Sequence, residues 1–262
     1  MEILVCMKQV PDDSVEIHLD AAGKPDLSQA DPQGNAFDTY ALELAVRYIE
    51  ANGGTVTVAT VGTEDDKVCL KNSLAVGAAK AYLISNEGLE NPDASQTAKL
   101  LAAAVPAMEA ENGAAFDLIL CGRESTDYIC GEVGEMLAEE LKRPFVTNVV
   151  EVKQEGEELL VKKELDAGYQ LVSAPLPAVL TISKPDYDPR YPNIKSKLAA
   201  RKAKIPGIGS EQTGMAGAPC ARVSFVGFLE PPVRQAGVKI QEKEPEDAVA
   251  KAMELLAAAK VL

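Results

Sequence analysis

The chain has 262 residues, and its 26 basic and 40 acidic residues give a formal net charge of −14, so binding to nucleic acid or to anionic membranes is disfavoured. Its length suffices for a sizeable core, and no apolar run approaches the length that spans a bilayer. The N-terminal residues lack the basic flank and cleavage site of a signal peptide, so we expect a cytoplasmic protein without membrane insertion.

Short apolar runs alternate with helical patterns along the first 142 residues. The apolar runs of strand length are residues 2–7, 55–61, 81–85 and 117–121. The helical patterns are residues 37–50, 66–76, 95–108 and 131–142. This alternation predicts an α/β fold with a doubly wound, mostly parallel, Rossmann-like sheet. Such sheets bind ligands beyond the carboxyl ends of their strands, at the loops 8–13, 61–65 and 122–130.

The pattern changes after residue 147. Residues 149–152, 158–164, 169–173 and 178–182 read as strands of a β-meander. From residue 184 to 244 there is little periodicity and much proline and glycine, apart from a basic, helix-like stretch at 195–204. A final helix is expected at 246–259. We therefore divide the chain into an α/β domain, 1–183, with its meander at 148–183, and a long C-terminal arm, 184–262, that wraps a partner.

The most informative stretch is a strand, a polar turn and a helix at residues 116–141. Gly122 ends the strand, and Gly131 to Gly134 open an amphipathic helix. The free N–H groups and positive dipole end of a helix can bind a phosphate or another anion, and glycines let a ligand approach the backbone. The alternative is an ordinary strand-to-helix turn whose glycines serve only the turn geometry.

Other common sites have no support in the sequence. There is no G-x-G-x-x-G after the first strand and no G-x-x-x-x-G-K-S/T, which disfavours a nicotinamide Rossmann domain and a P-loop NTPase. The five cysteines form no C-x-x-C pair, and His18 is the single histidine. Neither a metal centre nor a Ser/His or Cys/His catalytic pair is expected.

The turn also resembles the nucleotide-binding turn of the small (beta) subunit of electron-transfer flavoproteins. The matching positions are Gly122, Asp127, Val133, Gly134, Ala138, Leu141 and Pro144. Further resemblances follow in order along the chain at residues 5–12, 35–45, 188–194 and 230–239. The chain departs from the family pattern at Tyr128, where glycine is common, and at Glu132, which puts a carboxylate beside the expected phosphate.

The resemblance implies a heterodimer with an alpha subunit that holds most of the redox-active FAD, shared between the subunits. The beta subunit's own pocket would hold AMP or a second FAD, and the loop 9–14 would approach a flavin at the interface. The backbone N–H groups of residues 131–133 would face the phosphate. The cofactor-binding residues carried over are Cys6, Asn35, Ala36, Phe37, Asp38, Val61, Gly122, Arg123, Glu124, Ser125, Thr126, Asp127, Tyr128, Ile129, Cys130, Gly131, Glu132 and Val133.

The implied function is electron transfer between NADH or acyl-CoA dehydrogenases and acceptor oxidoreductases, with flavin-based bifurcation as one alternative. No catalytic residue is expected, and NADH oxidation would need bifurcation and the alpha subunit. Partner docking is expected at Tyr187, Arg190, Tyr191 and Lys195, with Tyr187 as an exposed anchor. A stand-alone adenine-nucleotide-binding protein of stress-response or nucleotidyl-transfer type is the alternative class.

Overall fold

The computed structural model describes residues 1–86, 88–89, 91–156, 158–213, 220–233 and 236–262. Its residues form two compact units, Met1–Ile17 with Pro25–Val226, and His18–Lys24 with Gly227–Leu262. None of the described helices combines the length and apolarity needed to cross a bilayer.

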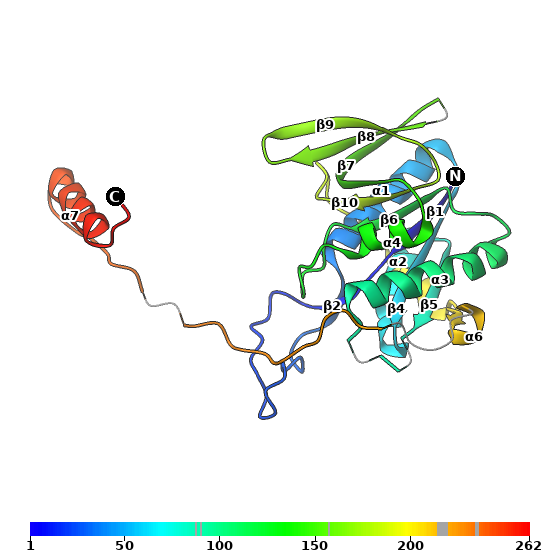
Figure 1. Cartoon of the computed structure of the whole chain (residues 1–262), viewed down its shortest axis with the longest axis horizontal. Coiled ribbons are helices and arrows are strands. Elements are labelled where there is room, and N and C mark those ends of the chain that lie inside the picture. The colour runs from blue at the N-terminus through cyan, green and yellow to red at the C-terminus, as the bar shows by residue number, and fades with distance from the viewer. Residues whose placement is uncertain (87, 90, 157, 214–219, 234–235) are drawn as a thin grey trace. The chain divides into compact units, whose positions relative to one another are not determined.

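The first unit is built on one large sheet (Figure 1). Among the described residues, the strand order is β11-β5-β4-β1-β6-β10-β7-β8-β9. These strands are β1 Glu2–Cys6, β4 Thr55–Gly62, β5 Lys80–Ser85, β6 Leu118–Gly122, β7 Phe145–Glu155, β8 Glu158–Leu165, β9 Gly168–Ala174, β10 Ala178–Ile182 and β11 Gly207–Ile208. A separate hairpin pairs β2 Gln9–Pro11 with β3 Pro32–Gly34.

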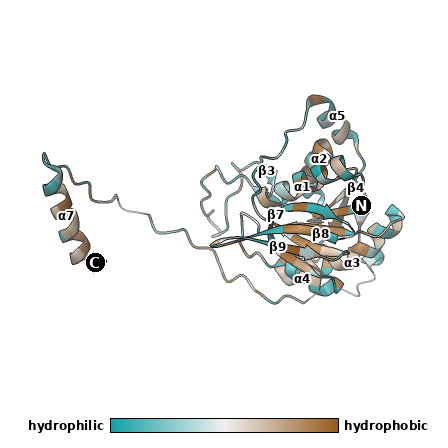
Figure 2. Cartoon of the chain, turned by 90° about the horizontal axis from the view of Figure 1, so that it is seen from above, coloured by the Kyte–Doolittle hydropathy of each residue, from teal (hydrophilic) through white to brown (hydrophobic). Residues whose placement is uncertain are grey.

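Helices cover both faces of the sheet. They are α1 Ala36–Asn52, the 3₁₀ helix η1 Glu64–Asp66, α2 Lys67–Val76, α3 Ala94–Asn112, α4 Val133–Leu141, α5 Ile194–Lys202 and α6 Ser210–Thr213. Figure 2 shows α1 and α2 on one side of the strands and α3 and α4 on the other. Alternate residues of β1 serve the two faces, because Ile3 packs with α1 and α2 while Leu4 packs with α3 and α4. The predicted doubly wound α/β fold is confirmed.

Strand β10 differs from the prediction that it continues a meander. Only β7, β8 and β9 form an antiparallel meander. Strand β10 instead lies between β6 and β7 and runs parallel to both. All five of its residues are buried, which suits the interior of a parallel sheet covered on both faces.

Residues 184–208 carry more structure than the sequence suggested. Helix α5 packs against α2, and β11 adds a parallel strand to the edge of β5. The side chains of Ile205 and Ile208 are buried there. This part of the expected arm therefore belongs to the compact first unit, whereas the functional division at residue 184 stays a prediction.

The second unit contains helix α7, Pro245–Ala258, close to the predicted 246–259. Within this unit, the Glu230 carboxylate accepts a hydrogen bond from the backbone N–H of Leu19 at 3.0 Å and lies 3.7 Å from His18 Nδ1. Arg234 and Gln235, which belong to the family-like tail at 230–239, lie outside the described residues.

Candidate functional site

The first turn of α1 ties together the carboxyl ends of β1 and β6. The buried Asp38 carboxylate accepts hydrogen bonds from the backbone N–H of Lys8 at 2.7 Å and of Gly122 at 2.9 Å. Burial is the largest influence and raises the pKa of Asp38 to about 7, although both N–H donors act in the opposite direction. One side chain thus joins two loops that the sequence predicted to lie at the ligand edge.

The close contact of α1 with β6 requires glycine at position 122. A Cβ atom there would lie 2.3 Å from Asp38 Oδ1 and 2.8 Å from both the Asp38 nitrogen and the Phe37 Cβ. Because the last two atoms belong to a packed helix start, no side-chain rotation can make room. The close approach that the structure has at Gly122 is between α1 and β6 within the chain itself.

Asn35 holds the polar turn that follows β6. Its side chain is 1% exposed, donates to the carbonyl of Glu124 at 2.8 Å and accepts from the backbone N–H of Thr126 at 3.1 Å. Its own N–H donates to the carbonyl of Lys8 at 2.9 Å. Both ends of the carboxamide are therefore used to define the shape of the turn.

Lys8 contributes to this site, although the sequence analysis did not name it among the site residues. Its ammonium group lies 2.6 and 2.8 Å from the two oxygens of Asp127 and 4.5 Å from the centre of the Tyr128 ring. The ion pair explains Asp127 as a residue that stabilises the turn. A cation directly after an apolar strand was the available signal, but its partner is more than 110 residues away.

Two other site residues, Arg123 and Phe37, are brought together beside the turn. The guanidinium of Arg123 lies 5.0 Å from the centre of the Phe37 ring, and it forms an ion pair of 2.7 Å with Glu124. Ala36 and Ser125 lie within the same segments. The turn and the start of α1 thus form one connected surface.

Helix α4 begins later than the sequence suggested. Gly131 has a left-handed φ of +65°, so it cannot belong to the helix, which begins at Val133 after the N-cap residue Glu132. The Glu132 side chain is exposed and makes no capping hydrogen bond. The first N–H groups of α4, which have no partner within the helix, are therefore those of residues 133–135 rather than 131–133.

Gly134 allows helix α4 to pack closely on the sheet. It is buried, and a Cβ atom there would lie 2.4 Å from the Cγ2 methyl group of Thr181 in β10. The absence of a side chain lets the first turn of α4 lie directly on the sheet. The sequence did not suggest this packing role, and ligand approach at this glycine stays a prediction.

The remaining predicted pocket residues are not joined to the turn in the same way. Cys6 is buried at the end of β1, and Val61 is half-buried and packs into the core. At the tip of the turn, Ile129 and Cys130 are exposed. Tyr128 instead meets Phe225, with 5.3 Å between the ring centres, a contact that the sequence did not suggest.

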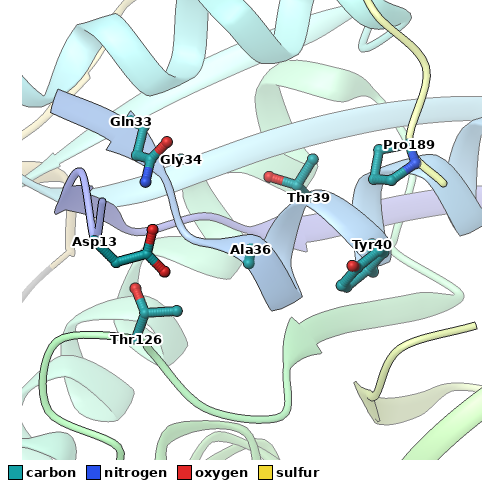
Figure 3. Close-up of a pocket in the computed structure, with 8 residues that line it drawn as sticks. All are labelled: Asp13, Gln33, Gly34, Ala36, Thr39, Tyr40, Thr126 and Pro189. Atoms are coloured by element: carbon teal, nitrogen blue, oxygen red, sulfur yellow. The ribbon is translucent and has the colours of Figure 1, made fainter. Parts of the chain in front are cut away.

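An open hollow of about 290 Å³ adjoins the turn and the start of α1. Its lining residues are Asp13, Gln33, Gly34, Ala36, Thr39, Tyr40, Thr126 and Pro189. Figure 3 shows Asp13, Gln33 and Thr126 at one end and Tyr40 and Pro189 at the other, with Ala36 and Thr39 between them. Ala36 and Thr126 are the predicted pocket residues that reach it.

The four expected docking residues have different surroundings. The ring of Tyr187 is partly buried 4.0 Å below the guanidinium of Arg47, and burial raises its pKa to about 12. Arg190 is bonded to helix α1. Tyr191 is 94% exposed, and Lys195 is exposed in α5. Tyr187 is therefore not the exposed side chain that was expected, whereas Tyr191 is exposed, and partner docking at these four residues stays a prediction.

Comparison with known proteins identifies the family. The sequence model of the electron transfer flavoprotein domain matches residues 28–210, which is more than half of the chain. The beta subunit of the electron transfer flavoprotein of Megasphaera elsdenii is 33% identical over 280 residues, covering 100% of both chains. The chain belongs to the beta subunits of the electron-transfer flavoprotein family.

Other family members with high coverage belong to named reductase complexes. Subunit CarD of the caffeyl-CoA reductase–Etf complex of Acetobacterium woodii is 33% identical over 222 residues, covering 84% of this chain and 82% of the relative. The acryloyl-CoA reductase electron transfer subunit gamma of Anaerotignum propionicum is 28% identical over 269 residues, covering 97% and 98%. Beta subunits of electron-transfer flavoproteins pair with an alpha subunit, and flavin takes part in the family's function.

Proposed function

We propose that this beta subunit binds an adenine nucleotide at the turn 122–133 and the start of α1. With its alpha subunit it carries electrons between a dehydrogenase and an acceptor oxidoreductase. The observation that supports the site best is the set of hydrogen bonds made by the side chains of Asn35 and Asp38. These side chains join the start of α1 to the loop after β1 and to the turn after β6. A turn of this length would otherwise be free to adopt many shapes, and a pre-organised site loses less entropy on binding.

The residues present fit the phosphate of a nucleotide. The first N–H groups of α4 carry the positive end of the helix dipole, and no side chain caps them in the described structure. Two carboxylates of the turn, Glu124 and Asp127, are neutralised by Arg123 and Lys8. Glu132 is exposed, so its charge is screened by solvent.

The nucleotide is proposed to be either AMP or the adenosine part of a second FAD, and we favour FAD. A flavin supplies one- and two-electron chemistry when it is bound, and the surrounding protein sets its potential. The names of the caffeyl-CoA and acryloyl-CoA reductase relatives support an acyl-CoA dehydrogenase-type partner, with NADH as an electron source if the complex bifurcates. In either case the residues of this chain position the nucleotide and take no part in acid or base chemistry.

The test is to purify the alpha–beta complex, denature it and count the released nucleotides. Two FAD and no AMP for each heterodimer would support bifurcation. One FAD and one AMP would support a single-flavin carrier. If the complex releases no nucleotide beyond the shared FAD, the proposed site is overturned. A stable, nucleotide-binding beta chain that forms no complex would favour the stand-alone alternative.

A further inference from the structure

We propose that Arg190 is a positioning residue that fixes the docking segment 187–193 on helix α1 and so presents Tyr191 to the redox partner. This assignment rests on the proposed function, because it takes the segment to be the docking surface. It reverses the role that the sequence suggested for Arg190, which was direct contact with the partner.

Arg190 is held by two carboxylates of α1. Its Nε donates to Glu43 at 2.9 Å, and its two terminal nitrogens donate to Glu50 at 2.6 and 2.9 Å. The backbone N–H of Arg190 also donates to Glu43, at 3.1 Å. The planar guanidinium fork is matched to carboxylate pairs, and lysine could not make this set of bonds. These hydrogen bonds direct all three guanidinium nitrogens toward α1 rather than toward a partner.

The burial of Glu43 shows why this contact is structural. Its side chain is only 3% exposed, and an ionised carboxylate in such a place needs charged partners. Arg190 is the first of these, and Arg47 the second at 2.6 Å. Hydrogen bonds from Arg190 and Arg47 keep the pKa of Glu43 below its ordinary value in spite of burial. Loss of Arg190 would therefore free the segment and leave the Glu43 carboxylate with Arg47 as its charged partner.

A second contact holds the same segment three residues earlier. The Tyr187 ring stacks under Arg47, which lies between Glu43 and Glu50 on one face of α1. Glu43, Arg47 and Glu50 thus place alternating charges along that face of α1. Arg190 contacts the two carboxylates, and Tyr187 contacts the guanidinium between them. Between the two contacts the backbone has little freedom.

Exposed side chains follow directly after Arg190 in the chain. Tyr191 is 94% exposed, and Ile194 and Leu198 follow at helical spacing in α5 and are exposed as well. An apolar side chain held at such exposure is suited to insertion into a partner. Because Arg190 fixes the residue next to it, the orientation of this anchor depends on α1.

The test is made on the alpha–beta complex without any dehydrogenase. Amide hydrogen exchange of residues 187–193 is compared between the wild type, Arg190→Lys, Glu50→Gln and the double variant. Arg201→Lys, an exposed position in the last turn of α5, is the matched control. We expect exchange at least about tenfold faster in Arg190→Lys, a smaller effect in Glu50→Gln, a non-additive double variant and no change in the control.

Electron transfer with an acyl-CoA dehydrogenase of the same organism is then measured. Arg190→Lys should raise the KM for the dehydrogenase with kcat and flavin content unchanged. Unchanged exchange in the free complex together with a raised KM would overturn the proposal, because Arg190 would then act as a direct contact. Faster exchange with an unchanged KM would equally overturn it, and would show that the proposed docking surface, rather than the fixation on α1, is at fault.

Discussion

The contact between Gly134 and Thr181 makes a quantitative prediction about the start of α4. In Gly134→Ala the new Cβ would lie 2.4 Å from the Thr181 methyl group. Carbon atoms normally pack at about 3.5–4.0 Å, so helix and strand must separate by roughly 1 Å or more. Overpacking of this kind destabilises a protein by about 1–3 kcal/mol. The better helix propensity of alanine offsets up to about 1 kcal/mol.

We therefore expect a net destabilisation of about 1–2 kcal/mol, or a melting temperature lower by about 2–8 °C. Thr181→Ser removes the obstructing methyl group but keeps the hydroxyl, which accepts a hydrogen bond from the Asn148 N–H at 3.1 Å. The double variant Gly134→Ala/Thr181→Ser should recover most of the loss. Calorimetry of the alpha–beta complex at one protein concentration measures all four forms.

Two results would refute this reasoning. The first is a Gly134→Ala complex that melts with the wild type, which would show that the first turn of α4 can move freely. The second is a double variant no more stable than Gly134→Ala, which would place the clash elsewhere. Nucleotide content measured on the same samples tells whether a displaced α4 also loses its ligand.

Three further predictions concern the site and the docking segment. Gly131→Val should abolish nucleotide binding, because a β-branched residue is strained at φ +65°, whereas Gly156→Val, with the same φ and no atoms near its Cβ, should leave the extracted nucleotide unchanged. The buried carboxyl of Asp38 has a pKa of about 7 in the folded protein, against an ordinary value of 3.8. Its contribution to stability is therefore present at low pH and is lost as the pH rises to about 7. Asp38→Asn should flatten that part of a curve of stability against pH. Tyr191→Ala should raise the KM for the dehydrogenase several-fold with flavin content intact. The control Tyr187→Phe keeps the ring under Arg47 and should leave the KM unchanged. Equal rates at limiting dehydrogenase for Tyr191→Ala and wild type would exclude Tyr191 as the anchor.

The predictable part of the fold is the part that local pattern determines. Apolar runs and helical spacing located the strands of the large sheet and the α-helices of the first 142 residues to within a few positions, because burial imposes the periods of the elements directly on the sequence. The short hairpin of β2 and β3 was not predicted. The order in which strands pair leaves no comparable local trace. The run at 178–182 was found as a strand, but its place between β6 and β7 was not. The two residues of β11 are too few for any period to be visible.

The site shows the same division. Glycines and polar residues marked the turn after β6, since special backbone shapes need particular residues. The contacts that hold the turn join residues far apart in sequence, such as Lys8 with Asp127 and Arg190 with Glu43. Pairing of charges over such separations cannot be read from either segment alone. For this reason the ion pairs that hold Arg190 on α1 were not predicted from the sequence.

The position of β10 has a consequence for how the chain emerges from the ribosome. Strand β6 pairs with β1 on one side, and its other side is covered only by residues 178–182, more than 50 residues later. Until those residues have been synthesised, the nascent chain carries an apolar strand, Leu118–Gly122, with an open edge in its half-built sheet. Open edges of this kind recruit other strands, so the chain is prone to aggregate during this interval. A chain whose synthesis stalls or ends before residue 178 should therefore depend most on a chaperone.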